Sequence, residues 1–326
     1  MTKSELKIVF MGTPDFAAES LRSLVEGDYK VVAVVTTPDK PVGRHGNTLQ
    51  PSAVKQYALS AGLPVLQPEK LKDERFLKEL KSYNADLQIV VAFRMLPEIV
   101  WDMPKFGTFN LHASLLPQYR GAAPINWVII NGEKETGVTT FFLTHEIDTG
   151  KIILQKRIPI KASDDAEAVH DNLMTIGAEL VTKTVDLLIS SNGNITTVAQ
   201  ENLLENAGEL HAAPKIFKDT CRINWTLSVE NVYNFIRGLS PSPAAWTELI
   251  LPTSEPQPLK IFQTEKVFEN HSIECGSIIT DGKQHIDIAV KGGFIRALSL
   301  QLAGKKRMNT KDFLNGTKIN NGWKVK

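Results

Sequence analysis

The sequence predicts an α/β domain built on a parallel sheet, followed by a smaller antiparallel β-barrel. In the first half of the chain, short and continuously apolar runs alternate with segments of helical spacing. This alternation is typical of a parallel sheet covered by helices on both faces. In the last third, short strand-like runs are separated by hairpin dipeptides, Asp281-Gly282 and Gly292-Gly293. That pattern is typical of an antiparallel barrel or sandwich.

The elements of the first part follow from its hydrophobic pattern. Continuous apolar or β-branched runs predict strands at Lys7–Met11, Val31–Val35, Leu87–Phe93, Thr108–Leu111, Val138–Leu143 and Ile152–Ile158. Helical spacing of the apolar residues predicts helices at Phe16–Val25, Ser52–Ala61, Phe76–Leu80 and Ala166–Ile189. Ser52 is expected to be an N-cap, because its hydroxyl can accept a hydrogen bond from the first turn of a helix.

A change of composition after Ser190 marks the expected domain boundary, since the chain becomes polar there. We therefore expect a first domain at residues 1–190, a linker at 191–210 and a second domain at 211–326. Strands of the second domain are predicted at Leu259–Phe262, Ser277–Thr280, His285–Val290 and Phe294–Leu300.

Charge and cysteine content narrow the class of protein. Lys plus Arg is 37 and Asp plus Glu is 36, so the formal net charge is +1, which excludes a globally basic nucleic-acid coat but not a local basic patch. Cys221 and Cys275 offer no CxxC spacing, which argues against a disulfide framework. No apolar run approaches the ~18 residues of a membrane span, and the N-terminus has no signal-peptide pattern. We expect a cytoplasmic protein with no membrane segment.

In a parallel sheet the ligand usually lies beyond the carboxyl ends of the strands. The first such turn is Gly12-Thr13-Pro14-Asp15. It holds one glycine where a dinucleotide fingerprint needs three at fixed spacing, so a nicotinamide- or flavin-dependent oxidoreductase is a weak interpretation. The long polar stretch from Thr36 to Gln50 follows the second strand, and loops of that length tend to be functional.

Three polar residues form the candidate catalytic set. Asn110 and His112 alternate along a predicted strand and so share one face. An amide donor beside an imidazole suits stabilisation of an oxyanion at a carbonyl carbon. Asp148, in a polar loop between two strands, could orient the imidazole or take a proton. The structural alternatives are an ordinary hydrogen-bonding histidine and an ordinary hairpin turn. No nucleophile elbow, Walker loop or two-histidine zinc motif is present, so we expect neither a metal nor a covalent intermediate.

These segments also carry a family resemblance. The run Asn110–Pro117 (NLHASLLP), followed by Arg120–Ile125 (RGAAPI) and Asp148–Gly150 (DTG), resembles the formyltransferases that use 10-formyltetrahydrofolate. The opening Val9–Phe16 (VFMGTPDF), the loop Pro38–Arg44 (PDKPVGR) and the late Ile223-Asn224-Trp225 are similar to the branch of that family that formylates initiator methionyl-tRNA.

The resemblance implies a Rossmann-like catalytic domain, an OB-like tRNA-binding barrel, a folate donor and a tRNA substrate. It implies that Asn110, His112 and Asp148 are catalytic. The folate-contacting residues it implies are Phe93, Arg94, Met95, Leu96, Ser114, Leu115, Leu116 and Pro117. Lys40 and Arg44, in the loop after the second strand, and Lys215 and Lys218, at the start of the second domain, are the candidate tRNA contacts. We expect a monomer without a metal.

Two other functions stay open at this point. A formyltransferase acting on a sugar or purine-precursor amine would share Asn110, His112 and Asp148, and the Arg44 loop and the barrel favour tRNA over it. A non-catalytic folate- or RNA-binding module is the second alternative, and it would have no need of the three catalytic candidates.

Overall fold

The computed structural model describes residues 1–42, 48–204, 208–250 and 255–326. Its contacts divide the chain into two compact units. The first contains Met1–Gly121, Thr136–Ile158 and His170–Ala212, and the second contains Ala122–Glu135, Pro159–Val169 and Ala213–Lys326. The predicted fold class is confirmed, whereas the boundaries at 190 and 210 stay a prediction.

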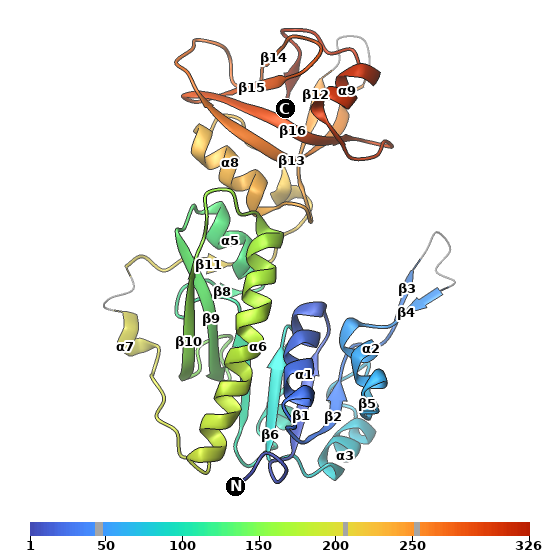
Figure 1. Cartoon of the computed structure of the whole chain (residues 1–326), viewed down its shortest axis with the longest axis vertical. Helices are drawn as coiled ribbons and strands as arrows, with labels where there is room; N and C mark the ends of the chain where they lie inside the picture. The colour runs from blue at the N-terminus through green and yellow to red at the C-terminus, as the bar shows by residue number, and fades with distance from the viewer. Residues whose placement is uncertain (43–47, 205–207, 251–254) are drawn as a thin grey trace. The chain divides into compact units, whose positions relative to one another are not determined.

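The first unit is built on a largely parallel sheet (Figure 1). Its strands are β1 (Ile8–Gly12), β2 (Val31–Val35), β5 (Val65–Leu66), β6 (Leu87–Val91), β7 (Thr108–His112), β9 (Glu135–Phe142) and β10 (Ile152–Pro159). They lie in the order β10-β9-β7-β6-β1-β2-β5. The pairs among β5, β2, β1, β6 and β7 are parallel, and β9 runs antiparallel to β7. The carboxyl ends of β6 and β7 are therefore neighbours.

Helices α1 (Asp15–Glu26), α2 (Ala53–Ser60), α3 (Glu74–Ser82), α4 (Glu98–Trp101) and the long α6 (Ala166–Ser190) accompany this sheet. The predicted cap of α2 is confirmed, because Ser52 Oγ accepts the Lys55 N–H at 3.1 Å. The turn from β1 into α1 needs glycine. A Cβ on Gly12 would lie 2.6 Å from Ala17 Cβ and 2.9 Å from the Val91 carbonyl oxygen, so the backbones pack there as no other residue would allow.

The second unit is a nearly closed antiparallel barrel. Its strands are β12 (Ala245–Ile250), β13 (Gln257–Phe268), β14 (Ile278–Thr280), β15 (Ile286–Val290), β16 (Gly293–Leu302), β17 (Met308–Asn309) and β18 (Lys324–Val325). The sheet order is β14-β15-β16-β13-β12-β18, with β17 on β16. Ile278 N–H donates to the Trp323 carbonyl (2.7 Å) and Val325 N–H to that of Gly276 (2.8 Å), which brings the two ends of the sheet together. Closure of this kind removes exposed strand edges.

Segments from earlier in the chain complete the second unit. Helix α8 (Val229–Gly238) packs on the barrel core through Val229, Val232 and Ile236. Asn126, from α5 (Pro124–Ile130), donates to the Gly238 carbonyl at 2.7 Å. The Arg237 guanidinium, buried in α8, donates to the Asp164 carbonyl at 2.6 Å. Residues 122–135 and 159–169 are thus part of this unit's packing.

The remaining elements are short: β3 (Lys40–Val42), β4 (Thr48–Gln50), β8 (Arg120–Gly121), α7 (Glu201–Leu204), β11 (Ala212–Ala213), a 3₁₀ turn (Asp219–Cys221) and α9 (Thr310–Gly316). Within the described part of the chain, no helix combines the length and apolar character that crossing a membrane requires.

Candidate active site

The candidate site lies at the end of β7. Phe109 and Leu111 point to the buried face of the strand, with 0% and 3% exposure, and are packed as core. Asn110 and His112 alternate with them and so share the other face, as the sequence predicts. His112 is 6% exposed, whereas Asn110 is half-buried. The strand therefore holds both side chains on a rigid element rather than on a loop.

His112 lies between two acceptors. Its Nε2 is 2.9 Å from the Tyr119 carbonyl oxygen, and its Nδ1 is 3.8 Å from Asp148 Oδ2. The ring of Phe141 meets the imidazole edge to face at 6.4 Å. The structure thus brings two of the three predicted catalytic residues, His112 and Asp148, side by side.

The hydrogen bonds of His112 determine where its protons lie. A carbonyl oxygen only accepts, so Nε2 must carry a proton and donate it to Tyr119. A neutral ring would then present the lone pair of Nδ1 to the Asp148 carboxylate. At 3.8 Å the carboxylate lies close enough to the ring to orient the imidazole.

Asp148 is held in an unusual backbone conformation. Its φ of 54° lies in the left-handed region, which costs energy for a residue other than glycine. Its Oδ2 accepts the Gly121 N–H at 2.9 Å, which positions the carboxylate. Two residues on, Gly150 packs so closely that a Cβ there would lie 1.6 Å from the Phe142 carbonyl oxygen.

Gln200 connects this turn to Arg120. Gln200 is completely buried. Its Nε2 donates to the Asp148 carbonyl (2.9 Å) and the Gly150 carbonyl (2.8 Å), and its Oε1 accepts two N–H groups of Arg120, at 3.0 and 2.6 Å. Sequence reasoning missed Gln200 because it lies in the polar stretch predicted as a linker. Its neighbours have no periodic pattern, so its sequence context carries no signal of burial.

Asn110 differs from its neighbours because its side-chain amide is uncommitted. We find no hydrogen bond to that amide among the described residues of the structure. A half-buried amide beside a histidine at the carboxyl edge of a sheet is available to donate to a bound ligand.

Residues 114–117 are mostly buried, and their hydrogen bonds are made within the protein. Ser114 is fully buried, and its hydroxyl donates to the Gln118 carbonyl at 2.6 Å. Leu116 is 2% exposed, and its N–H donates to Thr139 Oγ at 3.2 Å. Pro117 is also buried, and Leu115 is half-buried. The Ser114 hydroxyl is therefore neither a free contact for a ligand nor an available nucleophile.

Residues 93–96 follow β6 and lie beside the end of β7. The Arg94 guanidinium donates to the carbonyls of Pro68 and Glu69, the latter at 2.8 Å, and burial lowers the pKa of Arg94. Leu96 is buried and Phe93 half-buried. Met95 is 73% exposed. Arg94 anchors this segment, and Met95 presents an apolar surface at the edge of the sheet.

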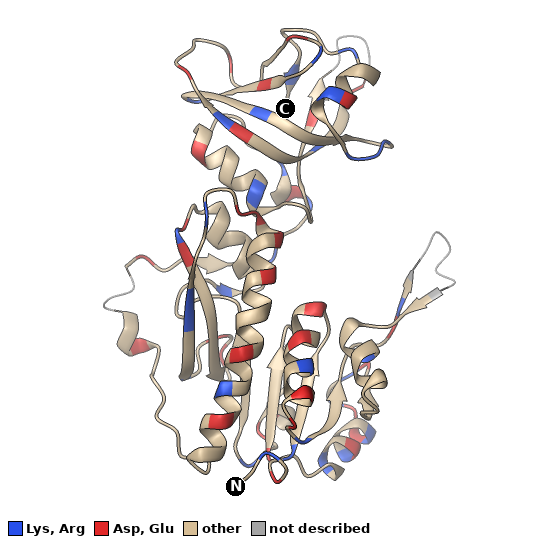
Figure 2. Cartoon of the chain, in the orientation of Figure 1, with Lys and Arg blue, Asp and Glu red and all other residues tan. Residues whose placement is uncertain are grey.

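The predicted tRNA contacts are distributed over both units. Lys40 is exposed on β3, and Arg44 lies outside the described residues. Lys215 and Lys218 are exposed in the second unit, where Lys215 Nζ lies 5.4 Å from the centre of the Phe217 ring. Figure 2 shows basic and acidic residues interspersed along the ribbon of both units, in agreement with the net charge of +1.

The described residues contain no group of three or more His, Cys, Asp or Glu side chains placed to hold a metal ion. What the site offers is an amide donor with no partner among the described residues, an imidazole beside a carboxylate, and an apolar edge. That set suits addition of an amine to a carbonyl carbon, in which oxygen gains charge and nitrogen loses a proton.

Comparisons with known proteins agree with this chemistry. A family model described as formyl transferase matches residues 6–185, and one described as formyl transferase, C-terminal domain, matches residues 215–318. The chain is 68% identical to a methionyl-tRNA formyltransferase of Parabacteroides distasonis over 98% of both chains. It is 60% identical to one of Bacteroides thetaiotaomicron over the full length of both. A sugar 3N-formyl transferase, solved in the presence of dTDP and 5-N-formyl-THF, shares the fold at a TM-score of 0.61 with 21% identity, over 92% of this chain and 99% of that one.

Proposed function

The chain belongs to the formyl transferase family, among the methionyl-tRNA formyltransferases, and on this premise we propose how its residues carry out the reaction. The enzyme formylates the amino group of methionine esterified to initiator tRNA. The formyl donor is a folate derivative, and we propose 10-formyltetrahydrofolate. The observation that carries the mechanism is the free amide of Asn110 on the same strand face as the His112–Asp148 pair.

In the proposed reaction the neutral methionyl amine attacks the formyl carbon of the donor directly. A new nitrogen–carbon bond forms while the carbonyl π electrons move to oxygen, which becomes negatively charged. Asn110 donates a hydrogen bond to that oxygen, and His112, on the same strand face, adds a second hydrogen-bond donor or a positive charge near it. The attacking nitrogen gives up a proton to the pair formed by His112 and Asp148. Collapse of the intermediate breaks the bond to the folate nitrogen, which leaves with a proton as tetrahydrofolate.

Asp148 acts in this scheme as a positioner and proton relay. A free Asp side chain has a pKa of about 3.9 and is a weak base at neutral pH. Its contact with His112 Nδ1 and its hydrogen bond from Gly121 instead suit it to hold the imidazole and pass on a proton. The buried, committed hydroxyl of Ser114 supports attack without a covalent protein intermediate.

We propose that the folate lies against Phe93, Arg94, Met95 and Leu96 on one side and the backbone of Ser114, Leu115, Leu116 and Pro117 on the other. The adjacency of β6 and β7 supports this, because both segments follow the carboxyl ends of these strands. Lys40, Arg44, Lys215 and Lys218 are the proposed tRNA contacts. We propose that the enzyme is a monomer and acts in the cytoplasm.

The test is formylation of charged initiator tRNA with and without 10-formyltetrahydrofolate, compared with formylation of an amino-sugar nucleotide. We expect donor-dependent transfer to the tRNA and none to the sugar. Acid quenching during turnover should trap no formyl group on the protein. Transfer to the sugar alone, or a trapped formyl-enzyme, would contradict the proposal.

A further inference from the structure

We propose that a groove on the barrel unit receives one unpaired nucleotide of the tRNA substrate, with its base against Phe217 and Trp246 and its phosphates at Lys218 and Lys260. This inference rests on the proposed function, because it takes the tRNA as the occupant. It goes further in naming a base-stacking site on a surface that is remote in sequence from the catalytic residues.

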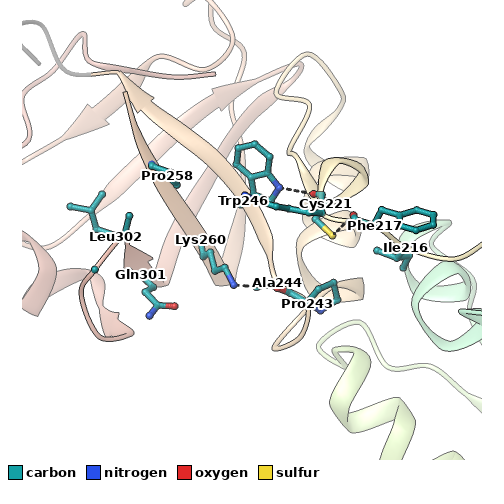
Figure 3. A pocket seen from close by; sticks show the side chains of 13 residues that line it. Ile216, Phe217, Cys221, Pro243, Ala244, Trp246, Pro258, Lys260, Gln301 and Leu302 are labelled. Carbon is teal, nitrogen blue, oxygen red and sulfur yellow. Dashed lines mark hydrogen bonds between the residues drawn. The ribbon is translucent and has the colours of Figure 1, made fainter. Parts of the chain in front are cut away.

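The groove has a volume of about 530 Å³, within the range of sites that hold small ligands. It is surrounded by residues 216–218 and 221, the chain from 243 to 246 at the start of β12, the start of β13, and the end of β16 with the turn that follows (Figure 3). Its lining is mostly apolar and includes Ile216, Pro243, Ala244, Pro258 and Leu302.

Two aromatic rings line this groove. Phe217 is 60% exposed. Exposure of an aromatic ring to water is unfavourable, and a stacked base would cover the ring. Trp246 is half-buried, and its indole N–H donates to the Lys218 carbonyl at 2.8 Å. That hydrogen bond fixes the indole ring and satisfies its one donor. The Arg222 guanidinium lies 5.3 Å from the ring centre, and the part of the ring that lines the groove is suited to stacking. Proteins that bind single-stranded nucleic acid combine such platforms with cations.

The charges along the groove favour an anionic occupant. Lys218 Nζ lies 5.9 Å from the centre of the Trp246 ring, and Lys260 Nζ lies 3.4 Å from the Pro243 carbonyl. The described residues that line the groove include these two lysines and no Asp or Glu. Glu248, which lies on β12, is already paired with Arg222 at 2.6 Å. Next to the lining residues in sequence, Lys305 and Lys306 follow Gly304, and Asp219 follows Lys218.

Aromatic rings beside lysines match a nucleotide better than a purely apolar peptide, because a nucleotide offers a flat π surface and a negative charge together. Bases within a paired stem are stacked on their neighbours and cannot enter a groove. The expected occupant is therefore an unpaired nucleotide of the tRNA.

The first test compares Phe217→Ala with Phe268→Ala, since Phe268 is similarly exposed (64%) and also lies on the barrel unit but outside the groove. We expect Phe217→Ala to raise the KM for charged tRNA roughly 5- to 150-fold, the range found for loss of one stacked base, with kcat little changed. Phe268→Ala should leave both constants unchanged. Equal KM values for the two variants would overturn the proposal that the groove binds a nucleotide.

The second test uses a single-stranded tetranucleotide and the full-length protein. It should quench tryptophan fluorescence, and Trp246→Phe should remove most of that quenching. Lys260→Gln should weaken binding and reduce its salt dependence, whereas Lys311→Gln on α9 should do neither. Absence of quenching would contradict the inference. Formylation of tRNA by the wild-type enzyme separates the two hypotheses. If that activity is present and the groove variants behave like their controls, the groove alone is refuted, whereas its absence refutes the proposed function and with it tRNA as the occupant.

Discussion

Asn110 and His112 differ in how much of their hydrogen-bonding capacity the folded chain uses. Both ring nitrogens of His112 face oxygen atoms of the protein, the Tyr119 carbonyl and Asp148 Oδ2. The amide of Asn110 has no such partner within the described residues. At the residue scale, the folded chain fixes the His112 ring from both nitrogens and leaves the Asn110 amide uncommitted, which suits the proposed contact of Asn110 with the substrate.

Replacing Asn110 should slow the chemical step. Both Asn110→Ala and the nearly isosteric Asn110→Asp remove the N–H donor, so each should lower kcat by about 100- to 1000-fold, the usual cost of one oxyanion donor. The free energy of unfolding should change little, since no intramolecular hydrogen bond is lost. Single-turnover formylation measures the effect, and an unchanged rate in Asn110→Ala would rule out this role.

Gln200 should act on the reaction through the position of Asp148. Removing its side chain in Gln200→Ala leaves the Asp148 and Gly150 carbonyls and the Arg120 guanidinium without partners. We expect a loss of about 1–3 kcal/mol in the free energy of unfolding and a fall in kcat of about 10- to 100-fold as the carboxylate moves. Gln56→Ala, at an exposed glutamine of α2, is the control. If kcat stays normal while stability falls, Gln200 has a structural role alone.

At the scale of elements, the turn between β9 and β10 depends on close backbone packing. Gly150→Ala would place a Cβ 1.6 Å from the Phe142 carbonyl oxygen, so the strand end must move. The Asp148 turn should move with it, and we expect both a lower melting temperature and at least a tenfold loss of activity. Gly316→Ala is a matched control, because its Cβ would meet no atom within 4 Å. Calorimetry and a formylation assay on both variants provide the comparison.

The hairpin β3–β4 is anchored at its base by Asp39. The carboxylate binds Lys55 Nζ at 2.6 Å and Gln67 Nε2 at 2.8 Å. The hydrogen bond from Lys55, followed by that from Gln67, lowers the pKa of Asp39. Because the folded-state pKa is depressed, this contribution to stability is present above the unfolded-state value of about 3.9 and is lost as the pH falls through the folded-state value.

A pH series on Asp39→Asn tests this anchor. The wild type should be more stable than the variant at neutral pH, and the difference should shrink below about pH 4 as the wild-type carboxyl becomes protonated. Urea unfolding between pH 3 and 7 measures it. A difference that is constant over this range would show that the charge of Asp39 contributes nothing.

The hydrophobic pattern predicted the elements whose own sequence signals burial. It did not predict elements that are defined by contacts with distant segments. Strands β1, β2, β6 and β7 are continuous apolar runs and were predicted. Helix α8 was not predicted, although its apolar stripe at Val229, Val232 and Ile236 and its Ser228 N-cap are visible in the sequence. Helix α5 is short, and its packing against α8 depends on a residue pair far apart in the chain, Asn126 and Gly238.

At the scale of the whole molecule, a nearly neutral protein must bind a polyanion through local patches. We expect the affinity for tRNA to fall as salt rises, with a log–log slope near −0.9 for each phosphate neutralised. A small number of contacts should give a correspondingly shallow slope and ready product release. Titration of the protein with initiator tRNA that carries no amino acid, between 50 and 300 mM salt, measures this slope. An affinity independent of salt would exclude electrostatic capture.

The sequence by itself determined the α/β and barrel classes, the family and the identity of the catalytic candidates, because hydrophobic periodicity and a contiguous motif are local properties. Only the tertiary structure decided that Ser114 faces inward, that Gln200 joins Arg120 to the Asp148 turn, and that Phe217, Trp246 and Lys260 line one groove. Apart from the local bond of Ser114 to Gln118, these relations are hydrogen bonds and contacts between residues well separated in the chain. Chain folding, rather than any local spacing, brings such groups within reach.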